Sequence, residues 1–363
     1  MNYLDSAAGG PDFSVRKPHH IPALKNFWYF SLPGSALKKG KMQHITLLGQ
    51  SILLGRTTDG QVFAMRNLCP HRSTPLHHGK FDGREVQCRY HGWKFNATGQ
   101  CTLIPSLLAP QEHYGDGIRN RTYPCREHQG GIWVFIGDRP ESDLPPVPVV
   151  PGIGDVAPQA YCSLNYPLNG EHSAYTFFDP SHVAFVHSSP FIRRRSHSIK
   201  DKIKNYEPAP LGWRMERRPV PADNLFYRLF GRNATTEISY LLPGTRIEVI
   251  QGEKHSAISL ATIAPISDQE TVIHQAMYWT FPYLWPIRGL VRYLIHHFLS
   301  EDREYARQQL EGLQQQQQPF MLIGDGDAQI RWFQQLRKAW LQSDADATPF
   351  VNPLKPETLR FRS

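Results

Sequence analysis

Two short pairs of cysteine and histidine stand out for the chemistry they could do. One residue separates Cys69 from His71, two separate Cys88 from His91, and sixteen lie between the pairs. Thiolate sulfur and imidazole nitrogen both bind zinc and iron, so two loops brought together would supply four ligands. Zinc loops more often pair Cys with Cys or His with His. The pattern therefore favours an iron–sulfur cluster, with structural zinc as the alternative.

A second set of possible ligands lies in an otherwise apolar stretch that contains Asp179, His182 and His187. In a helix, Asp179 and His182 would share one face, because they are three residues apart. His182 and His187 would lie about 140° apart on a regular helix. The helix must therefore bulge, tighten or end between the two histidines if both bind one metal. Iron that activates O2 is usually held by two His and one carboxylate, so another acid is needed.

The missing carboxylate is sought in the helix predicted from Ile287 to Leu313. Asp302 falls in a row of residues spaced by four, and the apolar members of such a row face the core. Glu301 lies on a different face and is the weaker candidate. A surface carboxylate paired with Arg303 is the alternative for Asp302, and helix geometry alone leaves both roles open. The other members of the row are Leu294, Phe298, Ala306 and Leu310.

Cysteine usage and hydropathy indicate the compartment. The chain has five cysteines, and the two in the Cys-His pairs leave an odd number and no disulfide framework, as in a reducing, cytoplasmic environment. Residues 1–20 lack the pattern of a secretory signal, and no run of eighteen apolar residues occurs. The amphipathic stretch from Leu284 to Leu299 could contact a membrane, but core packing is the preferred interpretation.

The formal net charge of +8 has three possible meanings. A solvated basic surface, nucleic-acid binding and attraction of an acidic electron-transfer partner all fit it. The basic residues are spread along the chain, and no nucleic-acid-binding motif stands out. The charge alone does not choose among the three.

The pattern of apolar residues places the candidate ligands in two β-rich regions. Strands separated by turns precede and follow the Cys-His pairs, and helices are predicted at 287–313 and 328–341. Proline recurs at five positions between Arg139 and Gly154, which is typical of an extended linker. The predicted strands are 27–30, 44–48, 51–54, 62–65, 85–87, 93–95, 132–136, 160–164, 237–242, 245–250, 255–264 and 271–280.

With both sets of motifs, the chain resembles the α subunits of Rieske non-haem iron oxygenases, the ring-hydroxylating and O-demethylating family, over essentially its whole length. Pro70 after Cys69 and the run from Tyr90 to Trp93 match the cluster-binding boxes. The single-chain organisation is similar to the monooxygenase and demethylase branch. The resemblance implies an α+β fold with an N-terminal all-β Rieske domain and a helix-grip (START-like) catalytic domain that contains an antiparallel sheet. The implied parts are a loose segment 1–24, a Rieske domain 25–138, a linker 139–154 and a catalytic domain 155–363.

The resemblance also implies roles for the candidate residues. Cys69, His71, Cys88 and His91 would hold a [2Fe–2S] cluster, and His182, His187 and Asp302 a mononuclear Fe(II). Asp179 would link His182 to a cluster histidine of the neighbouring subunit in a homotrimer. A helix N-cap is the alternative for Asp179, since Pro180 follows it. One departure from the family is that Tyr175 and Thr176 replace a common Glu-Asn pair.

The implied activity is oxygen insertion or oxidative demethylation of a small organic substrate with O2. Electrons would come from NAD(P)H through a separate reductase, either directly or through a ferredoxin, and no nucleic acid would be involved. A Rieske electron carrier without oxygenase chemistry is the first alternative, and a zinc-stabilised nucleic-acid-binding protein is the second. The substrate pocket is expected to be apolar or aromatic, with Arg193–Arg195 as a solvated run more than an anion site. Its expected lining is the sheet from Glu237 to Phe281 together with Phe177, Phe178, Phe185 and Phe191.

Overall fold

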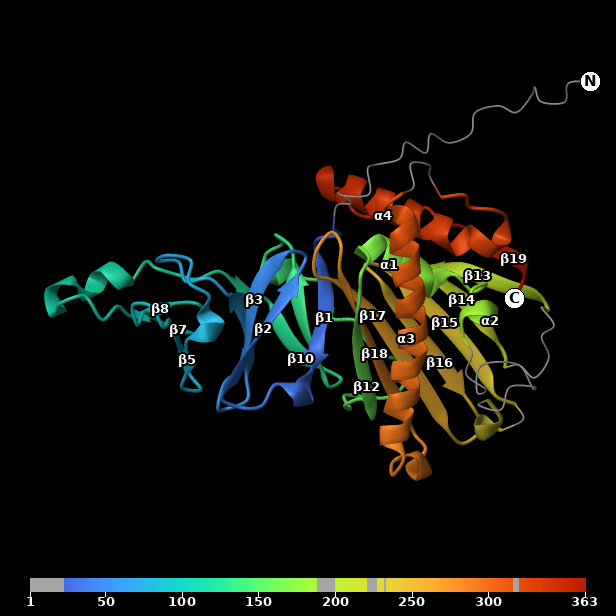
Figure 1. The fold of residues 1–363 in the computed structure, drawn as a ribbon, viewed down its shortest axis with the longest axis horizontal. Coiled ribbons are helices and arrows are strands. Elements are labelled where there is room, and N and C mark those ends of the chain that lie inside the picture. Colours follow the sequence, from blue (N-terminus) through green and yellow to red (C-terminus); the bar gives the residue numbers. More distant parts are fainter. Residues whose placement is uncertain (1–22, 188–199, 221–226, 232, 316–319) are drawn as a thin grey trace, which may run out of the picture.

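The computed structural model describes residues 23–187, 200–220, 227–231, 233–315 and 320–363. These residues form a smaller N-terminal region with three sheets and a larger C-terminal region built on one wide sheet (Figure 1). The α+β class expected from the sequence is therefore confirmed. Phe191, Arg193–Arg195 and almost all of the predicted loose segment 1–24 lie outside the described residues.

The N-terminal region consists of short antiparallel strands. β1 is apolar except for Ser31 and is buried on both faces, because one face packs within its own region and the other against the C-terminal region. The first sheet contains β1 (Phe27–Pro33), β11 (Gly131–Ile136) and β10 (Cys125–His128). The second contains β2 (Lys41–Leu47), β3 (Gln50–Arg56), β4 (Val62–Arg66) and β9 (Thr122–Tyr123). The third contains β5 (Lys80–Phe81), β6 (Glu85–Gln87), β7 (Lys94–Asn96) and β8 (Cys101–Leu103).

The C-terminal region is organised by one antiparallel sheet of eight strands. β15 shows why it forms: buried Thr236, Ile238 and Tyr240 alternate with less buried neighbours, as expected for a strand covered on one face. In spatial order the strands are β12 (Ala160–Tyr166), β18 (Thr271–Trp279), β17 (Ser256–Pro265), β16 (Thr245–Gln251), β15 (Thr235–Leu241), β14 (Gly212–Pro219), β13 (Asp201–Ala209) and β19 (Glu357–Arg362).

Helices cover the C-terminal sheet, and the long helix α3 crosses it beside β12 (Figure 1). This is the expected helix-grip arrangement. The helices are α1 (Gly170–Phe178), α2 (Val183–Val186), α3 (Arg288–Leu313) and α4 (Ala328–Ala345). Turns of 3-10 helix lie at η1 (Gly34–Ala36), η2 (Leu76–His78), η3 (Ala109–Gly115), η4 (Glu141–Asp143), η5 (Tyr227–Phe230), η6 (Pro282–Leu284) and η7 (Asp325–Asp327).

All twelve strands and both helices predicted from the sequence are confirmed, within a few residues at their ends. The sequence prediction missed β5, β8, β9, β10, β13, β14 and β19. β13 shows the reason: its exposed and half-buried residues hardly differ in polarity, so the alternation that marks a strand is weak.

The proline-rich stretch packs between the two regions. Val147 and Val150 share a buried cluster with side chains from both regions, among them Trp28 of β1 and Tyr278 of β18. The Trp28 indole N–H donates to the Pro145 carbonyl at 2.7 Å. Gln129 bonds the backbone of Val150 in both directions, at 2.9 and 2.7 Å. The stretch is therefore fixed by contacts that hold the two regions together.

A buried histidine at this junction predicts a pH-dependent stability. His274 accepts or donates a 2.7 Å hydrogen bond with the Tyr161 hydroxyl and lies against Phe30 of β1. Burial lowers its pKa from 6.5 to about 3. Between these values the unfolded chain binds a proton that the folded chain does not, so stability falls as the pH falls below 6.5.

Because of His274, we expect the free energy of unfolding to decrease by about 2 kcal/mol when the pH is lowered from neutral to about pH 5. Urea titrations at both pH values should show a smaller loss in His274→Gln than in the wild type. The exposed His296→Gln is the matched control. An equal loss in wild type and His274→Gln would contradict the prediction.

Candidate functional site

The two Cys-His loops have the same backbone fold despite their different spacing. Cys69 N–H donates to the Thr74 carbonyl at 2.9 Å, and Ser73 N–H to the Cys69 carbonyl at 2.8 Å. The second loop repeats both bonds, from Cys88 to Trp93 at 2.8 Å and from Gly92 to Cys88 at 3.0 Å. Ser73 and Gly92, in equivalent places, both have positive φ, of 56° and 72°. Each cysteine is thereby fixed at the start of a closed turn.

The loops bring their side chains together with the sulfurs inside and the imidazoles outside. Cys69 and Cys88 are each 3% exposed, in a buried cluster formed by side chains of the second and third sheets. The rings of His71 and His91 lie 4.6 Å apart at the surface, and His91 is exposed. Trp93 stacks on His71 at 4.5 Å with the rings 4° from parallel, which fixes the orientation of that imidazole. Two buried thiols beside two outward imidazoles fit a [2Fe–2S] cluster with unlike ends.

The same burial changes the pKa of the Cys69 thiol. Burial raises its pKa to about 11, and the nearby Cys88 acts in the same direction, while the backbone N–H groups of His71 and Arg72 act against it. A thiolate is the species that binds iron. Backbone N–H groups aimed at the sulfur therefore stabilise the form that a cluster requires.

The segment from Asp179 to His187 differs from its prediction. Asp179 and His182 were expected on one helix face, but α1 ends at Phe178 and α2 begins at Val183. Asp179 is the C-cap of α1, with its N–H bonded to the Tyr175 carbonyl at 2.9 Å. It is not a helix N-cap either. Its carboxylate accepts a 2.6 Å hydrogen bond from Ser181 N–H, so it closes the turn between the helices.

This break in the helix brings the two histidines together. The helix ends before His187, which has extended backbone, and this is one of the three ways expected from the sequence for both imidazoles to reach one metal. Nε2 of His182 lies 3.6 Å and Nε2 of His187 3.3 Å from Oδ1 of Asp302. The three side chains offer one ligand atom each within 4.8 Å of one another.

The chemistry of these three side chains fits a metal ion. Asp302 is 5% exposed, which rules out the alternative of a surface carboxylate paired with Arg303. Its Oδ1 and the Nε2 of His187 are buried and have no hydrogen-bond partner among the described residues. Buried polar atoms without a partner are costly, and a cation between them would satisfy both. Two His and one carboxylate are the donors of non-haem Fe(II) sites.

Two acids lie behind the histidines, and the sequence identified only one of them. Nδ1 of His187 is hydrogen-bonded to Glu301 at 3.0 Å, and Nδ1 of His182 lies 3.7 Å from Asp179. Acids of this kind orient imidazoles that bind metals. Glu301 was considered only as an inferior ligand. Its position next to Asp302 in the sequence could have indicated this role. Two adjacent acids at the edge of a buried helix face can contact the two ring nitrogens of one histidine, as Glu301 and Asp302 do with His187.

The acids also set the protonation of the histidines. Burial alone would lower the pKa of His182, but Asp179 and Asp302 outweigh it and raise this pKa to about 9. Burial lowers the pKa of His187 despite the opposing effect of Asp302 and Glu301. A proton on His182 thus balances the buried charge, and a metal ion would replace it.

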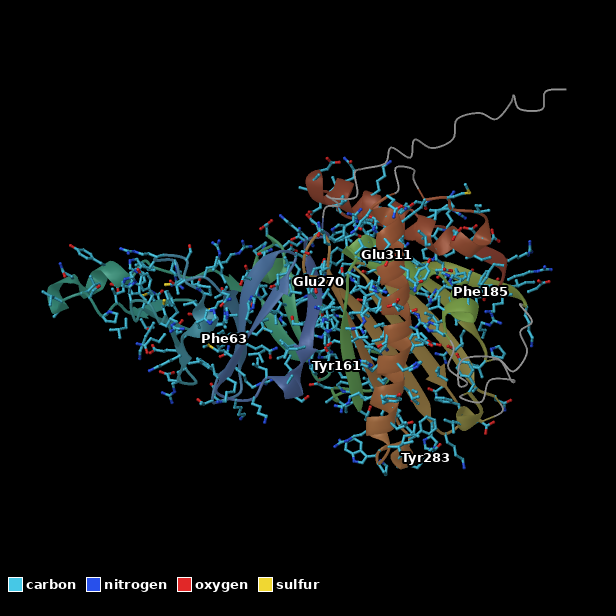
Figure 2. The ribbon with its side chains drawn as sticks, in the orientation of Figure 1. Phe63, Tyr161, Phe185, Glu270, Tyr283 and Glu311 are labelled. Carbon is cyan, nitrogen blue, oxygen red and sulfur yellow. The ribbon has the colours of Figure 1, made fainter. Side chains whose placement is uncertain are left out.

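The predicted aromatic lining is only partly accessible. Phe178 is 1% exposed and packs among Trp213, Tyr240 and Phe333, so it belongs to the core. Phe185 instead is 74% exposed on the outer side of α2. Figure 2 labels it on α2, and it lines a surface groove together with residues of α3 such as Glu301, which contacts His187. The groove is also lined by His297, Glu301, Glu304, Tyr305 and Gln308.

Comparison with known proteins agrees with the cluster site. Residues 27–115 match the family model of the Rieske [2Fe-2S] domain. The 4beta-methylsterol monooxygenase of Methylococcus capsulatus (strain ATCC 33009 / NCIMB 11132 / Bath) is 34% identical over 148 residues, 41% of this chain and 40% of that protein. The toluene-4-sulfonate monooxygenase system iron-sulfur subunit TsaM1 of Comamonas testosteroni is 31% identical over 184 residues, 50% of this chain and 51% of that protein. The chain thus spans about half or less of the curated relatives it matches.

A solved structure extends the likeness to both regions. Dicamba monooxygenase bound to dicamba superposes with a TM-score of 0.69 and 20% identity, over 89% of this chain and 98% of that one. At this identity the likeness shows the fold. Residues 27–115 therefore form a domain of the Rieske [2Fe-2S] family, and the fold of the two regions together is that of the dicamba monooxygenase structure.

Proposed function

We propose that this protein is an oxygenase that uses O2 to hydroxylate or oxidatively demethylate a small organic substrate. The observation that supports it best is the trio His182, His187 and Asp302, with unsatisfied buried ligand atoms, in a chain that also carries a Rieske domain. An electron carrier has no need of a second ligand set between helices α2 and α3 of a separate region. We assign the Rieske domain to residues 25–138, the linker to 139–154 and the catalytic domain to 155–363, after an N-terminal segment 1–24.

In this proposal the residues divide the work between the two sites. Cys69, Cys88, His71 and His91 hold a Rieske cluster that accepts single electrons. His182, His187 and Asp302 would hold an Fe(II) ion, which would supply the O2 chemistry. Glu301 accepts a hydrogen bond from Nδ1–H of His187, which holds the proton on Nδ1 and leaves Nε2 unprotonated to bind iron.

The substrate is proposed to be a ring-bearing or apolar molecule. The names of relatives and of the similar structure point to a methylsterol, toluene-4-sulfonate and dicamba as their substrates or ligands. The electrons are proposed to come from NAD(P)H through a separate reductase, either directly or through a ferredoxin. The description of TsaM1 as a subunit of a monooxygenase system supports a multi-component arrangement. A cytoplasmic location and the absence of a nucleic-acid partner complete the proposal.

The arrangement of the two sites supports electron transfer between subunits. The cluster loops lie near β5 and β7 at one end of the molecule, while α2 lies beyond both the small sheets and most of the wide sheet (Figure 1). Electron transfer within one chain would have to cross the small sheets and most of the wide sheet. In a homotrimer, the exposed tip with Arg89, Tyr90 and His91 could instead dock at a neighbour's groove, where Glu301 and Glu304 offer opposite charge.

One experiment separates this proposal from a carrier or a zinc protein. The purified protein should be brown with a Rieske EPR signal, and a suitable substrate should stimulate O2 uptake when reductase and NADH are supplied. Candidates are sterols, aromatic acids and aryl sulfonates. His91→Ala should lose the signal, because alanine cannot bind the second iron. A colourless zinc protein, or a Rieske protein with no bound mononuclear iron and no O2 uptake with any candidate, would exclude the proposal.

A further inference from the structure

We propose that the beginning of helix α3 is a membrane-binding surface that takes anionic phospholipid. Large apolar and aromatic side chains gather there, on η6 and the first two turns of α3. We call them the helix-tip surface. They are Tyr283, Trp285, Ile287, Leu290 and Tyr293, and their exposed fractions are 53%, 55%, 43%, 52% and 63%. The proposal does not rest on the oxygenase activity.

The helix-tip surface is unusual because another side of the same segment is already packed against the protein and partly buried. Leu284, Val291 and Ile295 pack against the cluster around Phe281 and Trp279. The segment therefore carries apolar side chains on its exposed side as well as on its packed side, in addition to the exposed Arg288 and Arg292, whereas the exposed side of a surface helix is normally polar. Contiguous exposed apolar side chains of this kind mark interaction sites. The sequence pattern from Leu284 to Leu299 was assigned to core packing, which explains one of the two faces.

The types of side chain match the interface between water and lipid. Trp285, Tyr283 and Tyr293 each combine an apolar ring with a polar group, as aromatic residues at bilayer interfaces do. Arg288 lies 4.8 Å from the Trp285 ring, and Arg292 is exposed one turn later. No Asp or Glu occurs between Phe281 and Ser300. A basic, aromatic surface without carboxylates is complementary to anionic headgroups.

The shape of the surface also favours a bilayer. η6 and the first turns of α3 extend past the ends of the strands at one pole of the molecule, where Tyr283 lies (Figures 1 and 2). A stable protein interface usually buries about 800 Å² on each partner over a broad area. A projecting helix end offers less area, but it can insert its side chains among headgroups. No helix within the described part of the chain has the length and hydropathy to cross a bilayer, so the contact would lie on the membrane surface.

Vesicle co-sedimentation of the purified full chain tests the proposal. The wild type should sediment with vesicles of phosphatidylcholine and phosphatidylglycerol, and more weakly with phosphatidylcholine alone. Trp285→Ser with Tyr293→Ser should lower the partition coefficient by about tenfold or more, because two exposed aromatic side chains that would insert among the lipid headgroups are lost. Arg288→Gln with Arg292→Gln should lower it about tenfold on the anionic vesicles only.

The matched control is Leu108→Ser with Ile203→Ser, which removes two exposed apolar side chains, 72% and 63% exposed, elsewhere on the surface. It should bind vesicles like the wild type. Absence of vesicle binding by the wild type, or equal binding by the Trp285/Tyr293 variant, would overturn the proposal. A lower oligomeric state of that variant in sedimentation velocity without lipid would also overturn it, since the surface would then be an interface between copies of this chain.

Discussion

Replacing Asp302 by alanine is expected to abolish mononuclear iron binding and turnover while the Rieske spectrum remains. Asp302 is buried between the Nε2 atoms of His182 and His187, so it is the carboxylate best placed to complete the ligand set. Loss of a residue that only orients a ligand costs about 10–100-fold in metal affinity. Loss of the ligand itself should cost more than that range. Iron content of the purified variant and its substrate-linked O2 uptake measure both effects.

The neighbouring acid provides the control for this prediction. Of the three proposed iron ligands, Glu301 is hydrogen-bonded to His187 alone, at Nδ1 and 3.0 Å. Glu301→Gln keeps a hydrogen-bond acceptor for this nitrogen and should retain iron. Glu301→Ala should weaken iron binding within the range of an orienting residue. If Glu301→Ala abolishes iron binding and Asp302→Ala does not, the wrong acid has been assigned.

A second measurement separates loss of the ligand from loss of the fold. Without metal, Asp302 stabilises the protonated form of His182, so alanine also removes a buried charge partner from the metal-free protein. Each metal-free protein is therefore the reference for its own response to iron. Added Fe(II) should raise the melting temperature of the wild type and not that of Asp302→Ala, because only a bound ligand stabilises the folded state.

The sequence predicted Asp302 for a reason that does not extend to its surroundings. The four-residue spacing with Phe298 and Ala306 fixes a side of α3, and the inward direction follows from that helix alone. The pairing of Glu301 with His187 depends on how α2 packs against α3, which no local pattern contains. Side chains placed by one element were predictable, and contacts between elements were not.

The helix break at Asp179 could have been predicted. A residue before proline is disfavoured in the α conformation, and Asp179 has ψ of 114° before Pro180. Treating Asp179 and His182 as neighbours on one helix gave the right proximity for the wrong reason. The missed strands are different. In β13, Asp201, Ile203 and Asn205 are the exposed residues, so apolar and polar side chains share one face and the alternation is lost.

Asp179→Asn is expected to slow electron transfer from the cluster to the iron by about 10–100-fold, with both metals still bound. The aspartate has two oxygens with different partners: one accepts from Ser181 N–H, and the other faces Nδ1 of His182 at 3.7 Å. Asparagine can keep the bond to Ser181 only by turning its amide nitrogen toward His182. A donor then faces a donor, and the carboxylate bridge proposed between His182 and a neighbour's cluster histidine is lost.

Single-turnover oxidation of the reduced cluster, with substrate and O2 present, measures this step directly. Asp346→Asn is the matched control, because Asp346 is also the C-cap of a helix, α4, and is exposed. A purely structural role for Asp179 predicts wild-type rates in both variants, since asparagine supports the same turn. Slow oxidation in Asp179→Asn alone supports the relay. Wild-type rates in that variant would exclude the relay. Transfer between subunits is proposed because the cluster loops and α2 of one chain lie at opposite ends of the molecule (Figure 1), and a monomer in sedimentation would exclude it.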